Sequence, residues 1–196
     1  MARELSYSIA GPQPDAIVGL LAKQGWIPPR KPVVVSIDSV RETSIATDWF
    51  APAWKKRKSD VMASWDDGER LTVFDTNVVS GVQLLDFSAE SVLALLAQLR
   101  FEVAAFGPVH EDWALDPSSF ANNHDSFGWA VAFRGDGHKR IPSRRWLDAG
   151  PWRILRAPGD VTLVQFHDLA ASAAQAATQA GPGHDLMDAG YVRHPW

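Results

Sequence analysis

The chain contains no cysteine among its 196 residues. This absence excludes internal disulfide bonds, thiolate metal ligands and cysteine nucleophiles. Phosphate-binding glycine loops are missing as well. The segment 135–137 has two glycines but lacks the third glycine and the following helix pattern, and neither a P-loop nor a nucleophile-elbow sequence occurs. Nucleotide hydrolysis and serine catalysis are therefore disfavoured.

Long apolar runs are also missing. The longest apolar stretch, 92–106, is interrupted by Gln98, Arg100 and Glu102. The first seven residues do not combine a charged start with an apolar stretch, as a signal peptide does. We therefore expect a protein that does not enter a membrane and that resides in the cytoplasm.

The composition is that of a folded protein. Hydrophobic residues make up 46% of the chain and charged residues 21%, without low-complexity tracts. At this length, roughly 70% of the surface of the unfolded chain can be buried on folding. We expect a single globular domain over 1–196, in which a subdomain boundary could fall near 107–125.

Tryptophan is abundant, with nine residues in the chain. Two of the indoles adjoin basic side chains and define the candidate binding residues Trp54, Lys55, Lys56, Arg57, Arg144, Arg145 and Trp146. Tryptophan and arginine are enriched at the hot spots of protein interfaces. These residues therefore favour contact with another protein, although solvated loop charge is the simpler explanation for 55–58. An exposed indole could also close a homodimer.

Charge is unevenly distributed along the chain. The formal net charge is -4, yet 59–116 holds eleven acidic and two basic side chains. Segment 51–58 holds four basic and no acidic side chains, and 134–156 holds seven basic and two acidic ones. This segregation predicts surface patches of opposite sign. Pairing of the basic segments with the acidic one inside the molecule is an alternative of equal weight.

The first third of the chain predicts a strand, a helix and a second strand. Apolar residues alternate over 5–9, and helical spacing over 17–24 ends at Gly25. The β-branched run in 32–38 does not alternate, which is typical of a strand covered on both faces, and we expect it at the centre of a sheet.

The middle third predicts three antiparallel strands between 59 and 87, with a hairpin turn at Asp66-Asp67-Gly68-Glu69. Ser88 is placed to cap a helix, and apolar residues then recur with helical spacing at Val92, Leu96, Leu99 and Val103. We expect this helix to end at Gly107-Pro108.

The last third predicts a strand over 127–133 whose even positions are small, and a hairpin over 152–166 that turns at Pro158-Gly159. Asp168 can cap a helix over 170–180, which we expect to pack on the small face of 127–133. The whole pattern indicates an α+β fold, a mainly antiparallel mixed sheet with about three helices packed on it.

Histidines that directly precede an acid are the strongest candidates for chemistry. If the protein is an enzyme, His167, Asp168, His124 and Asp125 would form the site of a small metal-dependent hydrolase or a small-molecule-binding domain. The simpler interpretation, which we favour, makes Asp168 a helix cap and His167 a half-buried residue at a strand end.

A nucleic-acid interface is a further alternative. Segments 50–58 and 138–146 combine indoles, which can stack on bases, with lysine and arginine, which neutralise phosphates. Against this stands the sequence pI of about 5.8, because nucleic-acid binders usually carry a basic domain.

The sequence therefore favours a non-catalytic domain that binds another protein through the acidic 59–116 segment or the Trp-Arg segments. Such a domain would be an inhibitor or an immunity-type antitoxin that neutralises its partner. No cofactor or metal is expected.

Overall fold

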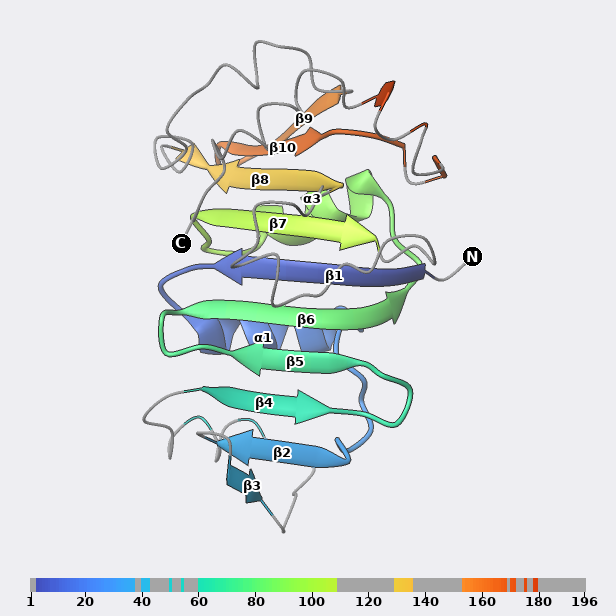
Figure 1. The fold of residues 1–196 in the computed structure, drawn as a ribbon. Coiled ribbons are helices and arrows are strands. Elements are labelled where there is room, and N and C mark those ends of the chain that lie inside the picture. The colour runs from blue at the N-terminus through green and yellow to red at the C-terminus, as the bar shows by residue number, and fades with distance from the viewer. Residues whose placement is uncertain are drawn as a thin grey trace.

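The computed structural model describes residues 3–37, 40–42, 50, 54, 60–108, 129–135, 153–168, 170–171, 175 and 178–179. Its strands are β1 (Arg3–Ala10), β2 (Val34–Ile37), β3 (Val40–Glu42), β4 (Val61–Ser64), β5 (Arg70–Val73), β6 (Val78–Leu85), β7 (Val103–Pro108), β8 (Ala130–Arg134), β9 (Arg153–Ala157) and β10 (Val161–Gln165). These strands form one sheet, in the order β3-β2-β4-β5-β6-β1-β7-β8-β10-β9 (Figure 1).

Every strand pairing among the described residues is antiparallel. The first strand of the chain, β1, lies between β6 and β7, so that strands on either side of it come from separate parts of the sequence. The three strands predicted between 59 and 87 are confirmed as β4, β5 and β6, which lie side by side. The hairpin predicted over 152–166 is confirmed as β9 and β10.

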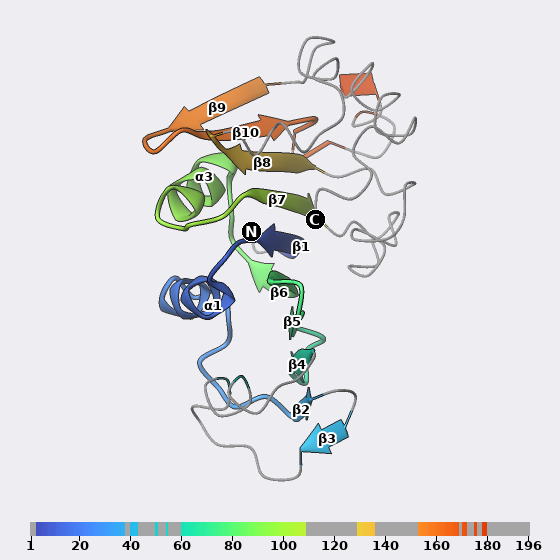
Figure 2. The same ribbon diagram turned by 90° about the vertical axis from the view of Figure 1, so that its left-hand side faces the viewer.

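The helices α1 (Pro14–Lys23) and α3 (Ala89–Ala97) lie on the same face of the sheet (Figure 2). We call this face the helix side and the opposite one the open side. The α+β class is confirmed, but the described residues form two helices with defined bounds, not about three. Most of 170–180 lies outside the described residues. No helix of the described part of the chain is long and apolar enough to cross a membrane.

Both helices begin where the sequence places a start signal. Pro14 stands at the start of α1, where its missing N–H costs no hydrogen bond. Ser88 and Ser91 form a reciprocal capping box at α3, in which each side chain accepts a hydrogen bond from the backbone N–H of the other residue. The start predicted at Ser88 is therefore confirmed.

The end of α3 differs from the prediction, because the helix stops at Ala97 and Val103 begins β7. The backbone N–H of Glu102 already donates to the carbonyl of Ala10, 2.8 Å away, at the end of β1. Pairing with β1 and β8 thus overrides the helical spacing of the side chains beyond Leu99.

The expected central position of 32–38 is also wrong. Strand β2 is second from the edge of the sheet, between β3 and β4. Its residues Val35, Ser36 and Ile37 are nevertheless buried on both faces, as the missing alternation predicted. Lack of alternation therefore reports coverage of a strand and not its distance from the edge.

Odd-numbered residues of β1 form the centre of the core on the helix side. Leu5, Tyr7 and Ile9 are buried in one cluster with Ile17 and Leu21 of α1. A smaller cluster on the open side joins Ala10 to residues of the other strands: Val78, Val103, Val131, Phe133, Val164 and Phe166. Burial on the open side also extends to β1 and β6, where Ser6, Ser80 and Val82 are less than 10% exposed. The sheet is therefore buried on both faces over most of its strands, and the open side is exposed at parts of β4 and β5, at the end of β6 and at the edge strand β9.

Candidate functional site

The β4–β5 hairpin carries charged side chains on both faces of the sheet. Its turn closes with hydrogen bonds from the backbone N–H of Trp65 to the carbonyl of Glu69 (3.0 Å) and from the N–H of Gly68 to the carbonyl of Trp65 (3.2 Å). Gly68 adopts a φ of 87°, a conformation that side chains disfavour. The predicted turn at 66–69 is thereby confirmed.

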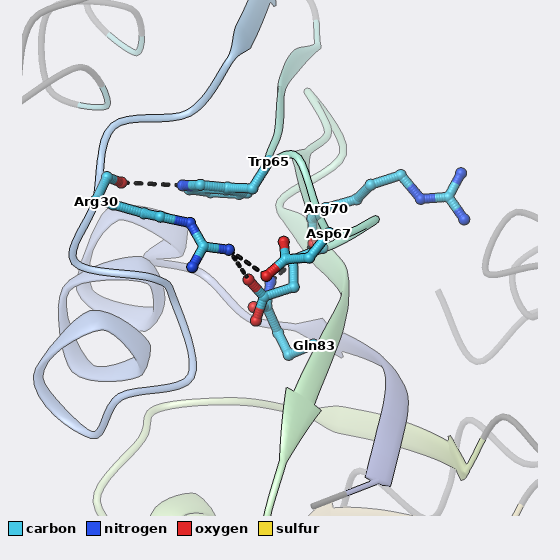
Figure 3. Close-up of polar contacts among 6 residues, drawn as sticks. Arg30, Trp65, Asp67, Arg70 and Gln83 are labelled. Atoms are coloured by element: carbon cyan, nitrogen blue, oxygen red, sulfur yellow. Dashed lines mark hydrogen bonds and ion pairs between the residues drawn. The ribbon is translucent and has the colours of Figure 1, made fainter.

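On the helix side, Arg30 ties the connection after α1 to this hairpin (Figure 3). One guanidinium nitrogen of Arg30 donates to the carboxylate of Asp67 and, at 2.8 Å, to that of Glu69. The indole Nε1 of the buried Trp65 donates to the Arg30 carbonyl, 2.9 Å away. We call Arg30, Trp65, Asp67 and Glu69 the Arg30 clasp.

The two carboxyls of the clasp differ in their surroundings. The hydrogen bond from Arg30 lowers the pKa of Asp67 below its usual value. Partial burial raises the pKa of Glu69, and the adjacent Asp67 carboxyl adds to this shift. The arginine therefore stabilises one negative charge more than the other.

Two buried polar side chains lie on the helix side close to the clasp. Gln83 of β6 donates through Nε2 to the carbonyl of Arg70, 3.0 Å away. Tyr7 of β1 packs over Gly81, where a Cβ atom would approach its hydroxyl oxygen to 2.5 Å. Burial raises the pKa of Tyr7, so the hydroxyl stays protonated. These contacts fix the backbone at the start of β5.

On the open side, the same hairpin presents Arg70, whose side chain points away from the clasp (Figure 3). The strand pairing places Ser64 and Val82 beside Arg70, and Met62 and Leu84 lie diagonally from it on the same face. Met62 is 40% exposed and Leu84 57%. We call Met62, Arg70, Thr72 and Leu84 the Arg70 patch.

No described helix covers the Arg70 patch, because α1 and α3 lie on the opposite face (Figure 2). The described residues offer the Arg70 guanidinium no carboxylate within ion-pair distance. The patch can therefore present two apolar side chains and a cation to a partner. Met and Arg are both enriched in protein interfaces.

The structure describes one of the seven predicted binding residues. Trp54 is half-buried, packs against the helix-side core and stacks on Phe50 with ring centroids 5.6 Å apart. Part of this indole therefore serves the fold. The other six, Lys55, Lys56, Arg57, Arg144, Arg145 and Trp146, lie outside the described residues, and their role stays a prediction.

Other tryptophans belong to the core. Trp26, Trp65 and Trp129 are all less than 10% exposed. Trp26 packs edge-on against Tyr7, and Trp129 packs edge-on against Phe87 with centroids 5.7 Å apart. The abundance of indoles thus reflects core packing in three of the four tryptophans that the structure describes.

Of the candidate hydrolase residues, the structure describes His167 and Asp168. His167 is buried rather than half-buried, and its Nδ1 lies 2.8 Å from the Asp168 carbonyl oxygen. Asp168 Oδ1 accepts from the backbone N–H of Ala170 at 3.0 Å, as a cap does. His124 and Asp125 lie outside the described residues. Within the described part of the chain, no three histidine or acidic side chains are close enough to hold a metal ion.

Acidic residues of the described part of 59–116 lie at separate places in the fold. Asp67 and Glu69 lie at the β4–β5 turn, whereas Asp75 lies at the β5–β6 turn, at the opposite end of the strands. Some acids are paired within the molecule, as Asp67 and Glu69 are by Arg30 and Glu90 is by Arg153 at 3.0 Å. Arg153 belongs to the basic segment 134–156, so its ion pair with Glu90 is an instance of the pairing inside the molecule that the sequence left as an alternative. Arg30 lies outside both basic segments.

Comparison of the chain with models of protein families, with curated proteins and with solved structures finds no match.

Sequence reasoning missed the Arg70 patch. Its signal is the alternation within 61–73, which places Val61, Ala63 and Leu71 on one face and Met62 and Arg70 on the other. The sequence could not reveal that both helices lie on the face of the first set.

Proposed function

We propose that this chain is a protein-binding domain of the inhibitor type, which docks on its partner with the open side of β4 and β5 and with Leu84 at the end of β6. The Arg70 patch carries the proposal. It sets two exposed apolar side chains diagonally on either side of an arginine on paired strands. Arginine is frequent at binding hot spots, and apolar neighbours exclude water from the contacts it makes.

The Arg30 clasp supports this proposal because it holds the β4–β5 hairpin in place from the helix side, opposite the patch. Trp65 and Glu69 flank the turn, and both are tied to Arg30. A binding surface held in place before the encounter loses less conformational entropy on association. The patch is therefore preorganised on paired strands.

Affinity capture with paired variants tests the proposal. The full chain is immobilised and exposed to a lysate of the cells that produce it, beside Leu84→Asp and Ile154→Asp. Ile154 is a matched control, because it is an exposed apolar strand residue on the open side, at the far edge of the sheet. We expect a stoichiometric protein to bind the wild type and Ile154→Asp but not Leu84→Asp. Equal capture by both variants would exclude the patch as the docking surface.

A further inference from the structure

We propose that Arg70 binds a carboxylate of the partner protein, and that apolar side chains flanking this carboxylate pack on Met62 and Leu84. This inference rests on the proposed function and specifies the chemistry of the partner. The occupant is a protein segment that is acidic at its centre and apolar on both sides.

The strand register puts Arg70 between the exposed Met62 and Leu84 on the open side. Its neighbours across the strands are Ser64 and Val82, both too short to cover a guanidinium group. Met62 lies diagonally on the β4 side and Leu84 diagonally on the β6 side. A cation is thus flanked by apolar groups on two sides, which is the arrangement that shields a charged hydrogen bond from water.

Charge identifies the group that Arg70 would receive. Among the open-side residues of β4, β5 and β6, Arg70 carries the one charge, since the others are Met62, Ser64, Thr72, Val78, Ser80, Val82 and Leu84. The nearest paired carboxylates, Asp67 and Glu69, are held by Arg30 on the helix side. A basic partner segment would be repelled here, whereas a carboxylate matches the planar fork of the guanidinium.

The backbone beneath Arg70 is fixed, which gives the guanidinium a defined origin. The Arg70 carbonyl accepts a hydrogen bond from Gln83 Nε2 at 3.0 Å. It also lies 2.8 Å from the position of a Cβ at Gly81, which leaves little room for the strands to shift. Helix-side residues therefore hold the backbone of Arg70 in place, while its side chain lies on the open side.

Photochemical cross-linking tests the chemistry of the partner directly. A benzophenone side chain replaces Thr72, which lies on the same face two residues from Arg70, in the full chain within the cells that produce it. Mass spectrometry then identifies the cross-linked peptide. We expect a peptide of another protein with aspartate or glutamate between apolar residues.

The outcomes separate this inference from the proposed function. A cross-linked protein segment without an acidic residue overturns the inference and leaves protein binding intact. A cross-link to a second copy of this chain also overturns it. Absence of any protein cross-link, with the labelled chain folded by circular dichroism, overturns both.

Charge reversal provides a second readout with the cross-linked partner. We expect Arg70→Glu to weaken binding by about tenfold or more, and Arg70→Lys to weaken it less, because lysine keeps the charge but loses the fork. Arg156→Glu is the matched control, since Arg156 is exposed on the same face at the edge strand β9. It should change the dissociation constant by no more than about twofold. Equal losses in Arg70→Glu and Arg156→Glu would overturn the inference.

Discussion

Arg134 links three elements through a single side chain. Its guanidinium donates to the carbonyls of Leu96, Ala97 and Leu99 at the end of α3, at 3.2, 3.0 and 2.8 Å. It also donates to the Gly159 carbonyl in the β9–β10 turn, at 2.6 Å. The last turn of α3 contains no basic residue of its own. Arg134 therefore supplies from β8 the positive charge that helix ends favour.

Replacing Arg134 with methionine should lower the free energy of unfolding by about 3 kcal/mol, because hydrogen bonds from charged donors are lost and carbonyls stay partly buried. Arg134→Lys should lose less, since one ammonium group can reach only some of these carbonyls. Urea denaturation gives the comparison. Arg156→Met, on the exposed edge strand, should change stability by less than about 0.5 kcal/mol. If Arg156→Met lowered the free energy of unfolding as much as Arg134→Met, Arg134 would contribute only its positive charge and not these specific hydrogen bonds.

Gly81 is the second residue whose identity the packing dictates. Alanine there would place Cβ 2.5 Å from the Tyr7 hydroxyl and 2.8 Å from the Arg70 carbonyl. We expect Gly81→Ala to destabilise the protein by about 2 kcal/mol, the cost of overpacking a well-filled site. Gly19→Ala is the matched control, because no atom lies within 4 Å of a Cβ at this helical position. It should stabilise the protein by about 0.5–1 kcal/mol in thermal denaturation. A stable Gly81→Ala would contradict the close approach of Tyr7.

At the scale of elements, the Arg30 clasp joins the α1–β2 connection to the β4–β5 hairpin, and its two carboxyls should respond to pH in opposite directions. The lowered pKa of Asp67 stabilises the fold above the usual carboxyl range, and this contribution is lost as pH falls through the folded value. The raised pKa of Glu69 stabilises the fold at low pH, and that contribution is lost as pH rises through the folded value.

The variants Asp67→Asn and Glu69→Gln should therefore show opposite trends relative to the wild type. Between about pH 3 and about pH 7, on either side of the ordinary carboxyl pKa values, Asp67→Asn should become less stable and Glu69→Gln more stable relative to the wild type. Urea unfolding at both pH values measures the difference. Trends of the same sign would show that Arg30 does not discriminate between the two carboxyls.

Local signals in the sequence predicted the elements well where neighbours along the chain also pair. The alternation in β4 and β5 and the Asp-Gly turn specify the hairpin, because register and turn lie within a few residues. The predicted end of α3 was wrong, because the residues beyond Ala97 pair with distant strands. Val103 continues the helical spacing but pairs with Phe133 and with Ala10, residues far away in sequence. No local pattern contains such partners.

The candidate site was less predictable than the fold. The sequence drew attention to Trp54 and His167, which are respectively half-buried against the core and buried. The sequence does not distinguish Arg70 as a binding residue, because an isolated arginine in an alternating strand belongs to no recognisable motif. Its significance comes from the placement of both helices on the other face, which depends on how the whole sheet assembles.

At the scale of the whole molecule, β1 joins the two halves of the sheet. On one side it pairs along its full length with β6, from Arg3 opposite Leu85 to Ala10 opposite Val78. On the other side it pairs with β7. The half formed by β2–β6 therefore contacts the half formed by β7–β10 chiefly through this one strand. Loss of packing at β1 should weaken both halves together, because neither contains an alternative central strand.

Ile9→Ala tests this coupling. Ile9 is fully buried on the helix side of β1, and removing its side chain should cost about 3 kcal/mol. We expect hydrogen exchange to accelerate by a similar factor for the most protected amides of β5 and of β10, because both open through global unfolding. Leu155→Ala, partly buried on the edge strand β9, should cost about 1 kcal/mol and accelerate exchange mainly in β9 and β10. Acceleration confined to β5 in Ile9→Ala would mean that the two halves unfold independently and that β1 belongs to only one of them.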